Sequence, residues 1–591
     1  MLIKSYSLLL ISAATFGAAW PAPLMPTPNQ KRDSYTLNIL HVNDVHSHLV
    51  PFDPGTGLEC PLEETPSLSS QSAGLGIRSP SEGDLEGDPE GESCVGGWGR
   101  IAGEVGRRRD SDPDRTIFLN SGDDAQGTWF WKEYGFKIIP EYLNLVKPVA
   151  WTPGNHDFDG GEDNLTKGIG QFEFPALAAN IEPATDLKKR LKPYVVLEEH
   201  KLVIIGLSTV DTKGRSKAHP NTKFNDPIRT AQKLVKKIRE KYPKEYRIIA
   251  LSHIGYELDQ RLAKETTDIS VIVGGHSHTG LGGMIGHTGR SEGPYPTMVK
   301  KKNGDDVCVL QAAMFGRYLG AFTATWKDDN KLEGCTSKWV ELDNKIKPDP
   351  KMNDLIKPLF DPLAKIAFKV VGHAANDITM GDPYNGKSLM GNFLADVMLE
   401  ASQNSAQKDG MKADFAFSTS GSIRFGIPKG KITAGRVNLI EPFGNLVVNW
   451  KMKGKDIWKM LEGVYSLQNQ YVDGIEGKMH RSFLHYSKGV QVKYDRSSDS
   501  KDGLRLKELN INGINVREDE NMDKEFTFAT SSWVMHGKES ILLGLKEKEW
   551  NKEPNVVGRM DTAILKYLKE HDPVEVDDED RIEGKNRESV S

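Results

Sequence analysis

Residues 154–157 read Gly-Asn-His-Asp and follow the apolar run 148–151 after two intervening residues. Four further stretches have the same character, a polar turn that comes after an apolar run: 43–46 (Asn-Asp-Val-His), 121–124 (Ser-Gly-Asp-Asp), 252–253 (Ser-His) and 275–278 (Gly-His-Ser-His). A short apolar run that ends in polar residues is typical of a buried strand, and α/β sheets place their functional sites at such strand ends. The five stretches therefore predict an α/β domain whose polar side chains gather at one rim.

These side chains are the kind that two neighbouring divalent cations require. Cations roughly 3.5–4 Å apart repel each other, so a bridging carboxylate and further carboxylate, amide or imidazole ligands must hold them. We interpret Asp123 as the bridge. The i, i+2 spacing of Asp44 with His46, and of His276 with His278, would put each pair on one side of an extended chain. Mixed nitrogen and oxygen donors suit zinc first, with manganese or cobalt as alternatives, and do not suit calcium.

His156 has a different predicted role because it follows the candidate ligand Asn155 and would face the open side of the cluster. There it can donate to a phosphoryl oxygen or to a leaving group. Asp159 can orient and charge this imidazole, and Asp157 is the competing partner. Any one of these motifs alone is more often a buried core histidine or a turn aspartate, but all five in this order are hard to explain in that way. We interpret three flanking residues as structural or supporting ones: His41, His48 and Asp124.

The start of the chain and its cysteines predict export. Residues 1–19 have a lysine near the start, an apolar stretch and small residues near the end, as a secretory signal peptide has. One Asn-Leu-Thr sequon at 164–166 agrees with export, although such triplets also occur by chance. The four cysteines allow three connectivities of two disulfides. The pairs favoured by proximity in sequence are Cys60–Cys94 and Cys308–Cys335.

Composition excludes some partners. At 591 residues with a formal net charge of −5, the chain has the size of two to four domains. It lacks the clustered Lys and Arg that nucleic-acid phosphates demand. The tail 571–591 is acidic and polar, whereas a glycolipid-anchor signal needs a hydrophobic tail. We therefore expect a secreted, extracellular protein without a membrane anchor or nucleic-acid partner. The sequence does not indicate an oligomeric state.

Changes in composition along the chain predict its domain boundaries. Residues 61–93 are rich in Ser, Gly, Glu and Pro, contain no aromatic residue and should form a flexible acidic loop. Residues 344–370 contain prolines followed by an amphipathic stretch, which predicts a linker helix. The first domain would then span 36–343, the second domain 371–570, and the polar tail the remainder.

With these motifs, the chain resembles the 5'-nucleotidase family, which includes ecto-5'-nucleotidases, secreted apyrases and bacterial UDP-sugar hydrolases. The likeness extends over about residues 37–585, and in the second half it rests on 391–392 (Gly-Asn), 422–424 (Ser-Ile-Arg), 442–445 (Pro-Phe-Gly-Asn) and 481–484 (Arg-Ser-Phe-Leu). The resemblance implies an α/β N-terminal domain, a two-sheet metallophosphoesterase sandwich with flanking helices. It also implies an α+β C-terminal domain that binds the nucleoside and rotates to deliver phosphate to the metals.

The resemblance implies a role for individual residues as well. One metal would be held by Asp44, His46, Asp123 and His278, and the other by Asp123, Asn155, His253 and His276. His156 and Asp159 would form the catalytic dyad. Arg424 would bind phosphate and Phe443 would stack on the base, a contact worth on the order of 1–3 kcal/mol. The full set of predicted substrate-binding residues is Arg424, Phe443, Asn445, Trp533 and Glu539.

The predicted nucleoside-binding residues, called the nucleoside grip below, depart from the family pattern. Thr419 stands where the family usually has a base-contacting Asn, and Trp533 stands where it has the second stacking Phe. Glu539 stands near where the family has the Asp of a Gly-Gly-Asp-Gly stretch. Its carboxylate could still accept hydrogen bonds from the ribose hydroxyls, but its side chain is one methylene longer than that of Asp. Lys387 is the nearby cation where the family usually carries an Arg ahead of 389–392.

Three functions remain open from the sequence. The leading one is a nucleotide hydrolase that uses two metals to activate water, either a 5'-nucleotidase acting on nucleoside monophosphates or an apyrase acting on ATP and ADP. The second is a nucleotide-sugar or cyclic-nucleotide phosphoesterase. The third is a binding protein that kept the fold and lost turnover. A phosphate-release assay with AMP, ADP, ATP and UDP-glucose, with and without a chelator, separates them.

Overall fold

A computed structural model describes residues 34–585 apart from 56, 61, 63–93, 287–288, 328–329, 384–385, 406–410, 466–482, 496–504, 537–554 and 578–580. Several predictions lie outside the described residues: the signal peptide at 1–19, nearly all of the loop at 61–93, Glu539 and part of the tail at 571–591.

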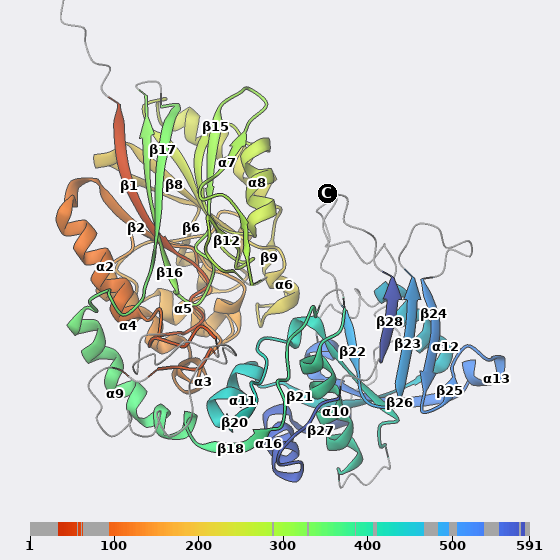
Figure 1. Ribbon diagram of the computed structural model, residues 1–591. Helices are drawn as coiled ribbons and strands as arrows, with labels where there is room; N and C mark the ends of the chain where they lie inside the picture. The colour runs from red at the N-terminus through yellow and green to blue at the C-terminus, as the bar shows by residue number, and fades with distance from the viewer. Residues whose placement is uncertain are drawn as a thin grey trace, which may run out of the picture.

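The N-terminal domain consists of two sheets packed face to face (Figure 1). The first sheet has the order β17-β16-β1-β2-β3-β4-β6, with β1 (Tyr35–Val42), β2 (Thr116–Asn120), β3 (Ala150–Trp151), β4 (Ala176–Leu177), β6 (Leu191–Lys192), β16 (Tyr318–Trp326) and β17 (Leu332–Glu341). The second has the order β14-β15-β11-β10-β8-β7, with β7 (Tyr194–Leu197), β8 (Leu202–Ser208), β10 (Arg247–His253), β11 (Ile269–Val273), β14 (Thr297–Lys300) and β15 (Asp306–Leu310).

Strand β1 is buried on both faces over its second half, Ile39–Val42, where three of the four residues are apolar. Side chains along a strand alternate between its two faces. Leu37 and Ile39 accordingly lie in the core between the sheets, where they join Leu251 of β10. Leu40 and Val42 lie in the core on the opposite face of β1, under the helices.

Helices cover both outer faces of the sandwich. The first sheet is covered by α2 (Trp98–Ser111), α4 (Ile139–Val146) and α9 (Pro350–Ala367), and the second by α7 (Pro227–Lys241) and α8 (Tyr256–Glu265). Helix α9 occupies the stretch where an amphipathic linker helix is predicted. It buries Met352, Ile356 and Phe360 in the core of the N-terminal domain, so it is packed against that domain before the chain continues into β18 (Figure 1).

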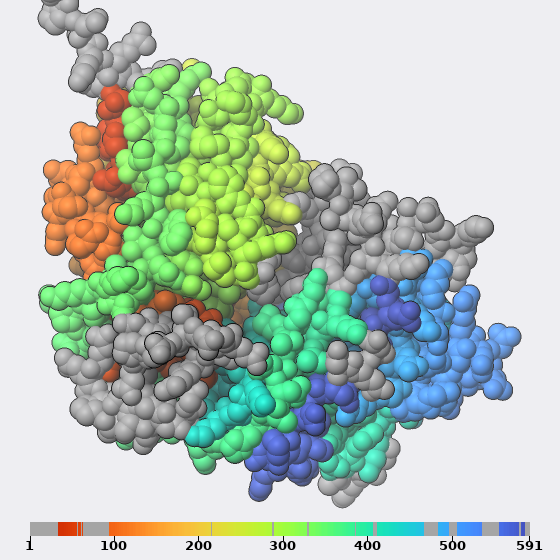
Figure 2. Space-filling model, viewed as in Figure 1, coloured from red at the N-terminus to blue at the C-terminus, as the bar shows by residue number. Residues whose placement is uncertain are grey.

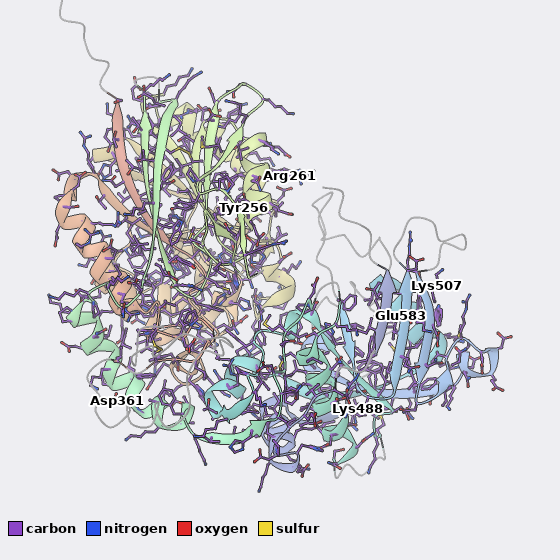
Figure 3. The ribbon with its side chains drawn as sticks, viewed as in Figure 1. Tyr256, Arg261, Asp361, Lys488, Lys507 and Glu583 are labelled. Atoms are coloured by element: carbon purple, nitrogen blue, oxygen red, sulfur yellow. A yellow bond between two sulfur atoms is a disulfide. The ribbon has the colours of Figure 1, made fainter. Side chains whose placement is uncertain are left out.

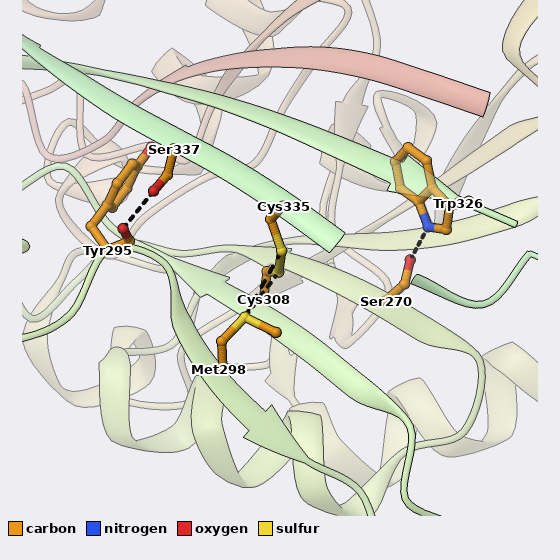
Figure 4. The surroundings of a disulfide bond; sticks show 7 residues. All are labelled: Ser270, Tyr295, Met298, Cys308, Trp326, Cys335 and Ser337. Carbon is orange, nitrogen blue, oxygen red and sulfur yellow. Dashed lines mark hydrogen bonds between the residues drawn. A yellow bond between two sulfur atoms is a disulfide. The ribbon is translucent and has the colours of Figure 1, made fainter. Parts of the chain in front are cut away.

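Both predicted disulfides are present, Cys60–Cys94 and Cys308–Cys335. The second one joins β15 to β17 and so links the two sheets (Figure 4). Met298 Sδ lies 3.5 Å from Cys308 Sγ beside this bond. Nearby, Trp326 Nε1 donates to Ser270 Oγ at 2.9 Å, which ties the same two sheets together. The α/β prediction for this domain is confirmed.

The C-terminal domain combines mixed sheets with helices, as predicted for an α+β domain. Its sheets have the orders β22-β19-β26-β21-β27 and β25-β24-β23-β28, beside a two-stranded β18-β20 pair. The strands are β18 (Val370–Ala374), β19 (Phe415–Thr419), β20 (Gly430–Thr433), β21 (Leu446–Lys453), β22 (Leu484–Tyr486), β23 (Val490–Asp495), β24 (Leu506–Ile511), β25 (Ile514–Asn515), β26 (Glu525–Ser531), β27 (Asn555–Arg559) and β28 (Ile582–Lys585). The helices that matter below are α10 (Leu389–Gln403), α11 (Ala434–Ile440), α14 (Ser532–His536) and α16 (Met560–Glu570).

The two domains lie against each other (Figure 2). In Figure 3, Tyr256 and Arg261 mark α8 of the N-terminal domain, whereas Lys488 and Glu583 mark the C-terminal domain. Lys132 of α3 (Trp129–Tyr134) forms an ion pair of 3.0 Å with Asp561 of α16. The rings of Phe315 and Phe425 stack with centroids 5.8 Å apart. These contacts bring residues of the C-terminal domain next to the strand ends of the N-terminal domain.

Candidate active site

The polar stretches found in the sequence converge in space at the ends of five strands. Asp44 lies just beyond β1, Asp123 beyond β2 and Asn155 beyond β3, whereas His253 is the last residue of β10 and His276 follows β11. Strands β1, β2 and β3 belong to one sheet, but β10 and β11 belong to the other. The rim is therefore shared by two packed sheets, which lets ligands approach a cation from two sides.

The structure forms two groups of residues that could each hold a cation. Asp44, His46 and His278 bring ligand atoms within 4.8 Å of one another, and so do Asp123, His253 and His276. Within the first group, His278 Nε2 lies 3.2 Å from Asp44 Oδ1. Within the second, His253 Nε2 lies 3.0 Å from Asp123 Oδ2.

The two groups are adjacent. His253 Nε2 lies 3.8 Å from Asp44 Oδ1, and His46 Nε2 lies 3.9 Å from Asp123 Oδ2. Asp44 and Asp123 are both essentially inaccessible to solvent. Two buried carboxylates this close to four imidazoles are stabilised when cations sit between them.

The backbone that presents these ligands is not extended, so the extended-chain argument for the i, i+2 pairs is wrong. Asp44 and His46 have φ of 52° and 50°, and His276 and His278 have φ of 78° and 53°. Non-glycine residues rarely adopt this left-handed conformation, which costs about 1–3 kcal/mol each and is concentrated at functional sites. Asp44 and His46 belong to one ligand group through a curled turn, whereas His276 and His278 belong to different groups.

Backbone hydrogen bonds hold these turns. Asp44 N donates to Gly122 O and His46 N donates to Asp123 O, both at 2.9 Å. The carboxylate of Asp157 accepts from the backbone N–H groups of Asp123, at 2.9 Å, and of Gly154, at 2.8 Å. Burial, with the nearby Asp123 carboxylate, raises the pKa of Asp157 well above its ordinary value. Asp157 thus braces the Asp123 turn.

Asp159, and not Asp157, is the partner of His156. His156 Nδ1 lies 2.8 Å from Asp159 Oδ2. Burial raises the pKa of Asp159 above its ordinary value, while the His156 imidazole acts in the opposite direction. The His156 and His46 rings lie edge to face, 5.3 Å between centroids, so His156 stands next to the candidate ligands with its Nδ1 occupied and its Nε2 available.

The imidazoles and an amide are arranged as cation ligands require. His253 Nδ1 lies 2.7 Å from the carbonyl of Ser121, and His46 Nδ1 lies 3.2 Å from the carbonyl of Ala125. A carbonyl oxygen only accepts, so Nδ1 must carry the hydrogen and the Nε2 lone pair of a neutral ring faces the cluster. Within the described part of the chain, the buried Asn155 Oδ1 has no hydrogen-bond partner. A bound cation would satisfy that oxygen.

The flanking polar residues are part of the supporting structure. His48 Nδ1 lies 3.1 Å from His46 O, and its ring stacks on Phe315 at 4.3 Å between centroids. Asp124 accepts from Trp151 Nε1 at 2.8 Å. His41 Nε2 lies 2.8 Å from the hydroxyl of Tyr295. These contacts agree with the interpretation of His41, His48 and Asp124 as structural or supporting residues.

One carboxylate near the ligands was not singled out in the sequence. Asp211 Oδ2 lies 3.6 Å from His276 Nε2. Asp211 follows β8, and neither the last residue of that strand, Ser208, nor the next residue, Thr209, is one of the histidine or Gly-Asp signals that mark the other strand ends. The position of β8 beside β10 in the sheet is the signal that would have identified it, and this signal requires the topology.

The C-terminal domain contributes a cationic and aromatic wall. The Phe443 and His156 rings are stacked, with centroids 6.2 Å apart, and the Arg424 guanidinium lies 5.1 Å from the Phe443 centroid. A cavity of about 440 Å³ lies between the domains, lined among others by His46, His278 and Arg424. Among the described residues, no direct ring contact joins Phe443 to Trp533 of α14. A base held between two rings would separate them, so the predicted stacking pair stays a prediction.

Comparisons with known proteins agree with this architecture. The sequence model described as calcineurin-like phosphoesterase matches residues 37–280, and the one described as 5'-nucleotidase, C-terminal domain matches residues 370–544. An apyrase from Tabanus yao is 25% identical, with 95% of this chain and 96% of that protein covered. Snake venom 5'-nucleotidase from Naja atra is 28% identical over 81% of this chain and 85% of that protein. The crystal structure of a 5'-nucleotidase precursor from Thermus thermophilus superposes with a TM-score of 0.75 at 27% identity, covering 94% of this chain and all of that one.

Proposed function

This chain belongs to the 5'-nucleotidase and apyrase family, and on that premise we propose that it is a secreted, metal-dependent nucleotide phosphohydrolase. It is a hydrolase of phosphate esters or anhydrides. The proposed reaction is release of phosphate from nucleoside monophosphates or, in the manner of an apyrase, from ATP and ADP. The observation that carries the proposal is the pair of adjacent ligand groups around Asp44 and Asp123 with His156 beside them.

We assign the ligands as the sequence predicts. Asp44, His46, Asp123 and His278 would hold one divalent cation, and Asp123, Asn155, His253 and His276 the other, with zinc first and manganese or cobalt as alternatives. Two such cations polarise a phosphoryl group and lower the pKa of water. Their ligands here already converge from two sheets, and the unpartnered Asn155 oxygen supports the assignment.

The remaining residues of the site act on the substrate directly. His156 has its Nε2 free to donate to a phosphoryl oxygen or to the leaving group, while Asp159 holds Nδ1 and fixes the ring. Arg424 presents a guanidinium for phosphate beside the ring of Phe443, which in turn stacks on His156. Phe443 offers an aromatic face for the nucleobase. In our proposal Trp533 and Glu539 complete the nucleoside-binding site. Asn445, from the same loop as Phe443, is the remaining proposed substrate-binding residue.

Secretion is also part of the proposal. Among the described residues, no helix combines the length and the apolar character needed to cross a membrane. The two disulfides suit an oxidising compartment. The venom 5'-nucleotidase is one of the similar proteins. The apolar stretch at 1–19 would serve as the export signal.

Chelation tests the metal requirement. We expect a chelator to abolish phosphate release from AMP, ADP and ATP, and added zinc, manganese or cobalt to restore it, because the clustered ligands have no other evident purpose. Phosphate release and bound metal are measured on the same samples. Full activity of a metal-free sample would overturn the metal-dependent proposal. Turnover of UDP-glucose without turnover of the nucleotides would favour a nucleotide-sugar hydrolase, and no turnover of any of them a binding protein.

Phe443→Ala tests the nucleobase contact. We expect the KM for AMP, GMP and UMP alike to rise by about 10-fold or more, because stacking contributes ~1–3 kcal/mol per base with little regard to base identity. Hydrolysis of a simple aryl phosphate, which lacks a base, should change little and serves as the internal control. An unchanged nucleotide KM would show that Phe443 does not grip the base.

A further inference from the structure

The loop that carries Phe443 is built around a buried acid. Residues 441–445 connect α11 to β21, and Glu441 at the start of the loop is only 4% exposed. Its Oε1 accepts hydrogen bonds from Asn445 N at 2.9 Å and from Asn445 Nδ2 at 3.0 Å. Gly444 has φ of 68°, which lets the chain fold back onto the carboxylate. Phe443 is therefore presented at the tip of a turn closed from inside by Glu441.

The far end of the loop is attached to the other half of the predicted nucleoside grip. Leu446 N donates to Ser532 Oγ at 2.9 Å, and Ser532 directly precedes Trp533. Asn445 O accepts from Met560 N, the first residue of α16, at 2.9 Å. The loop of Phe443 is thus hydrogen-bonded to the segment that carries Trp533, although the two aromatic residues lie 90 positions apart in the chain.

Stability alone does not explain an acid at this position. Burial raises the pKa of Glu441 to about 7, the hydrogen bonds from Asn445 oppose that rise, and the Asp561 carboxylate adds to it. A buried carboxyl group costs free energy unless hydrogen bonds compensate it. An apolar side chain of similar size would avoid that cost, but it could not accept the two hydrogen bonds that close the turn.

We propose that Glu441 is a positioning residue for nucleotide recognition: its side chain closes the 441–445 turn and thereby holds the Phe443 ring where a nucleobase stacks. The inference rests on the proposed function. Without the carboxylate, the turn gains conformational freedom in the free protein. Nucleotide binding must then remove that freedom, and this entropic cost weakens binding through the stacking contact. The phosphate end of the substrate, held by residues outside the loop, is not affected.

Steady-state kinetics of Glu441→Ala with AMP and with an aryl phosphate test the role. We expect the KM for AMP to rise about 5–10-fold, equal to ~1–1.4 kcal/mol, with kcat nearly unchanged and the aryl phosphate parameters at wild-type values. Glu441→Gln keeps an oxygen that accepts from Asn445, so it should restore most of the AMP affinity. Glu508→Ala, which removes a carboxylate that pairs with Lys493 in the same domain, is the matched control and should behave as wild type.

The outcomes separate this inference from the proposed function. If the wild-type protein hydrolyses no nucleotide, the proposed function fails before Glu441 is tested. The positioning role is wrong if the wild type is active but Glu441→Ala has the wild-type KM for AMP. It is also wrong if hydrolysis of AMP and of the aryl phosphate is impaired equally. If Glu441→Ala does not fold, Glu441→Asp tests the positioning role instead. It keeps the charge but shortens the side chain by one methylene, which moves the carboxylate away from Asn445. A raised KM for AMP alone then supports the role, and an unchanged KM rejects it.

Discussion

Replacing His156 by alanine should lower kcat for nucleotides by about 10²–10⁴-fold, the usual effect of removing a positioned acid–base group. The expectation follows from its placement. His156 Nδ1 is held by Asp159 at 2.8 Å, its ring stands beside the candidate ligands, and its Nε2 is left to donate to the substrate. Because His156 is not one of the assigned ligands, the metal content of the variant should stay near that of the wild type.

Turnover and bound metal, measured on the same preparation, test both parts of this expectation. Asp159→Asn should give a smaller loss, since the amide can still contact the ring but no longer stabilises its charged form. His571→Ala removes an exposed imidazole that pairs with Glu400 and is the matched control. Loss of metal from His156→Ala would reassign this residue as a ligand, and full activity would remove it from the mechanism.

Replacing Asp123 by alanine should have the second large effect, loss of both cations and of all turnover. Asp123 Oδ2 lies 3.0 Å from His253 Nε2 and 3.9 Å from His46 Nε2, so it faces both ligand groups. His278→Ala should mainly weaken one cation, because His278 contacts Asp44 of the first group. The difference between these two variants is the signature of a bridging carboxylate.

Metal analysis of the purified variants measures this difference directly, independently of activity. Asp305→Ala, which removes a half-buried carboxylate paired with Lys331 outside the site, should keep the wild-type metal content. If the Asp123 variant retained two ions per chain, the bridging role would be wrong. If the His278 variant lost both ions, the two sites would be more strongly coupled than we propose.

Much of the fold could be predicted from local sequence. The second half of β1 is buried on both faces, and a strand in that environment favours apolar residues at successive positions. The prolines and the amphipathic pattern at the start of α9 are local signals of a helix, and the helix is there. Both disulfides join cysteines that are near each other in sequence, so proximity sufficed to pair them. The two-domain α/β and α+β description is confirmed.

The candidate site was predictable in its residue types but not in its geometry. The polar residues after each strand predict the candidate ligands, because cations demand those donors. The left-handed turns at Asp44 and His276 were not foreseen, since φ is decided by the contacts that brace each turn. Asp211 was missed because only the neighbouring position of β8 and β10 brings it to His276.

The division between the two kinds of information has a physical basis. Strand and helix formation, the types of candidate donor and the pairing of nearby cysteines depend on residues close together in the chain, so the order of amino acids alone indicates them. The shared rim of two sheets, the choice of Asp159 over Asp157 and the contact of Phe443 with His156 depend on residues far apart in sequence or on competing hydrogen bonds. Such contacts form only when the whole chain packs, because each partner is selected by the free energy of the complete arrangement rather than by its own neighbours.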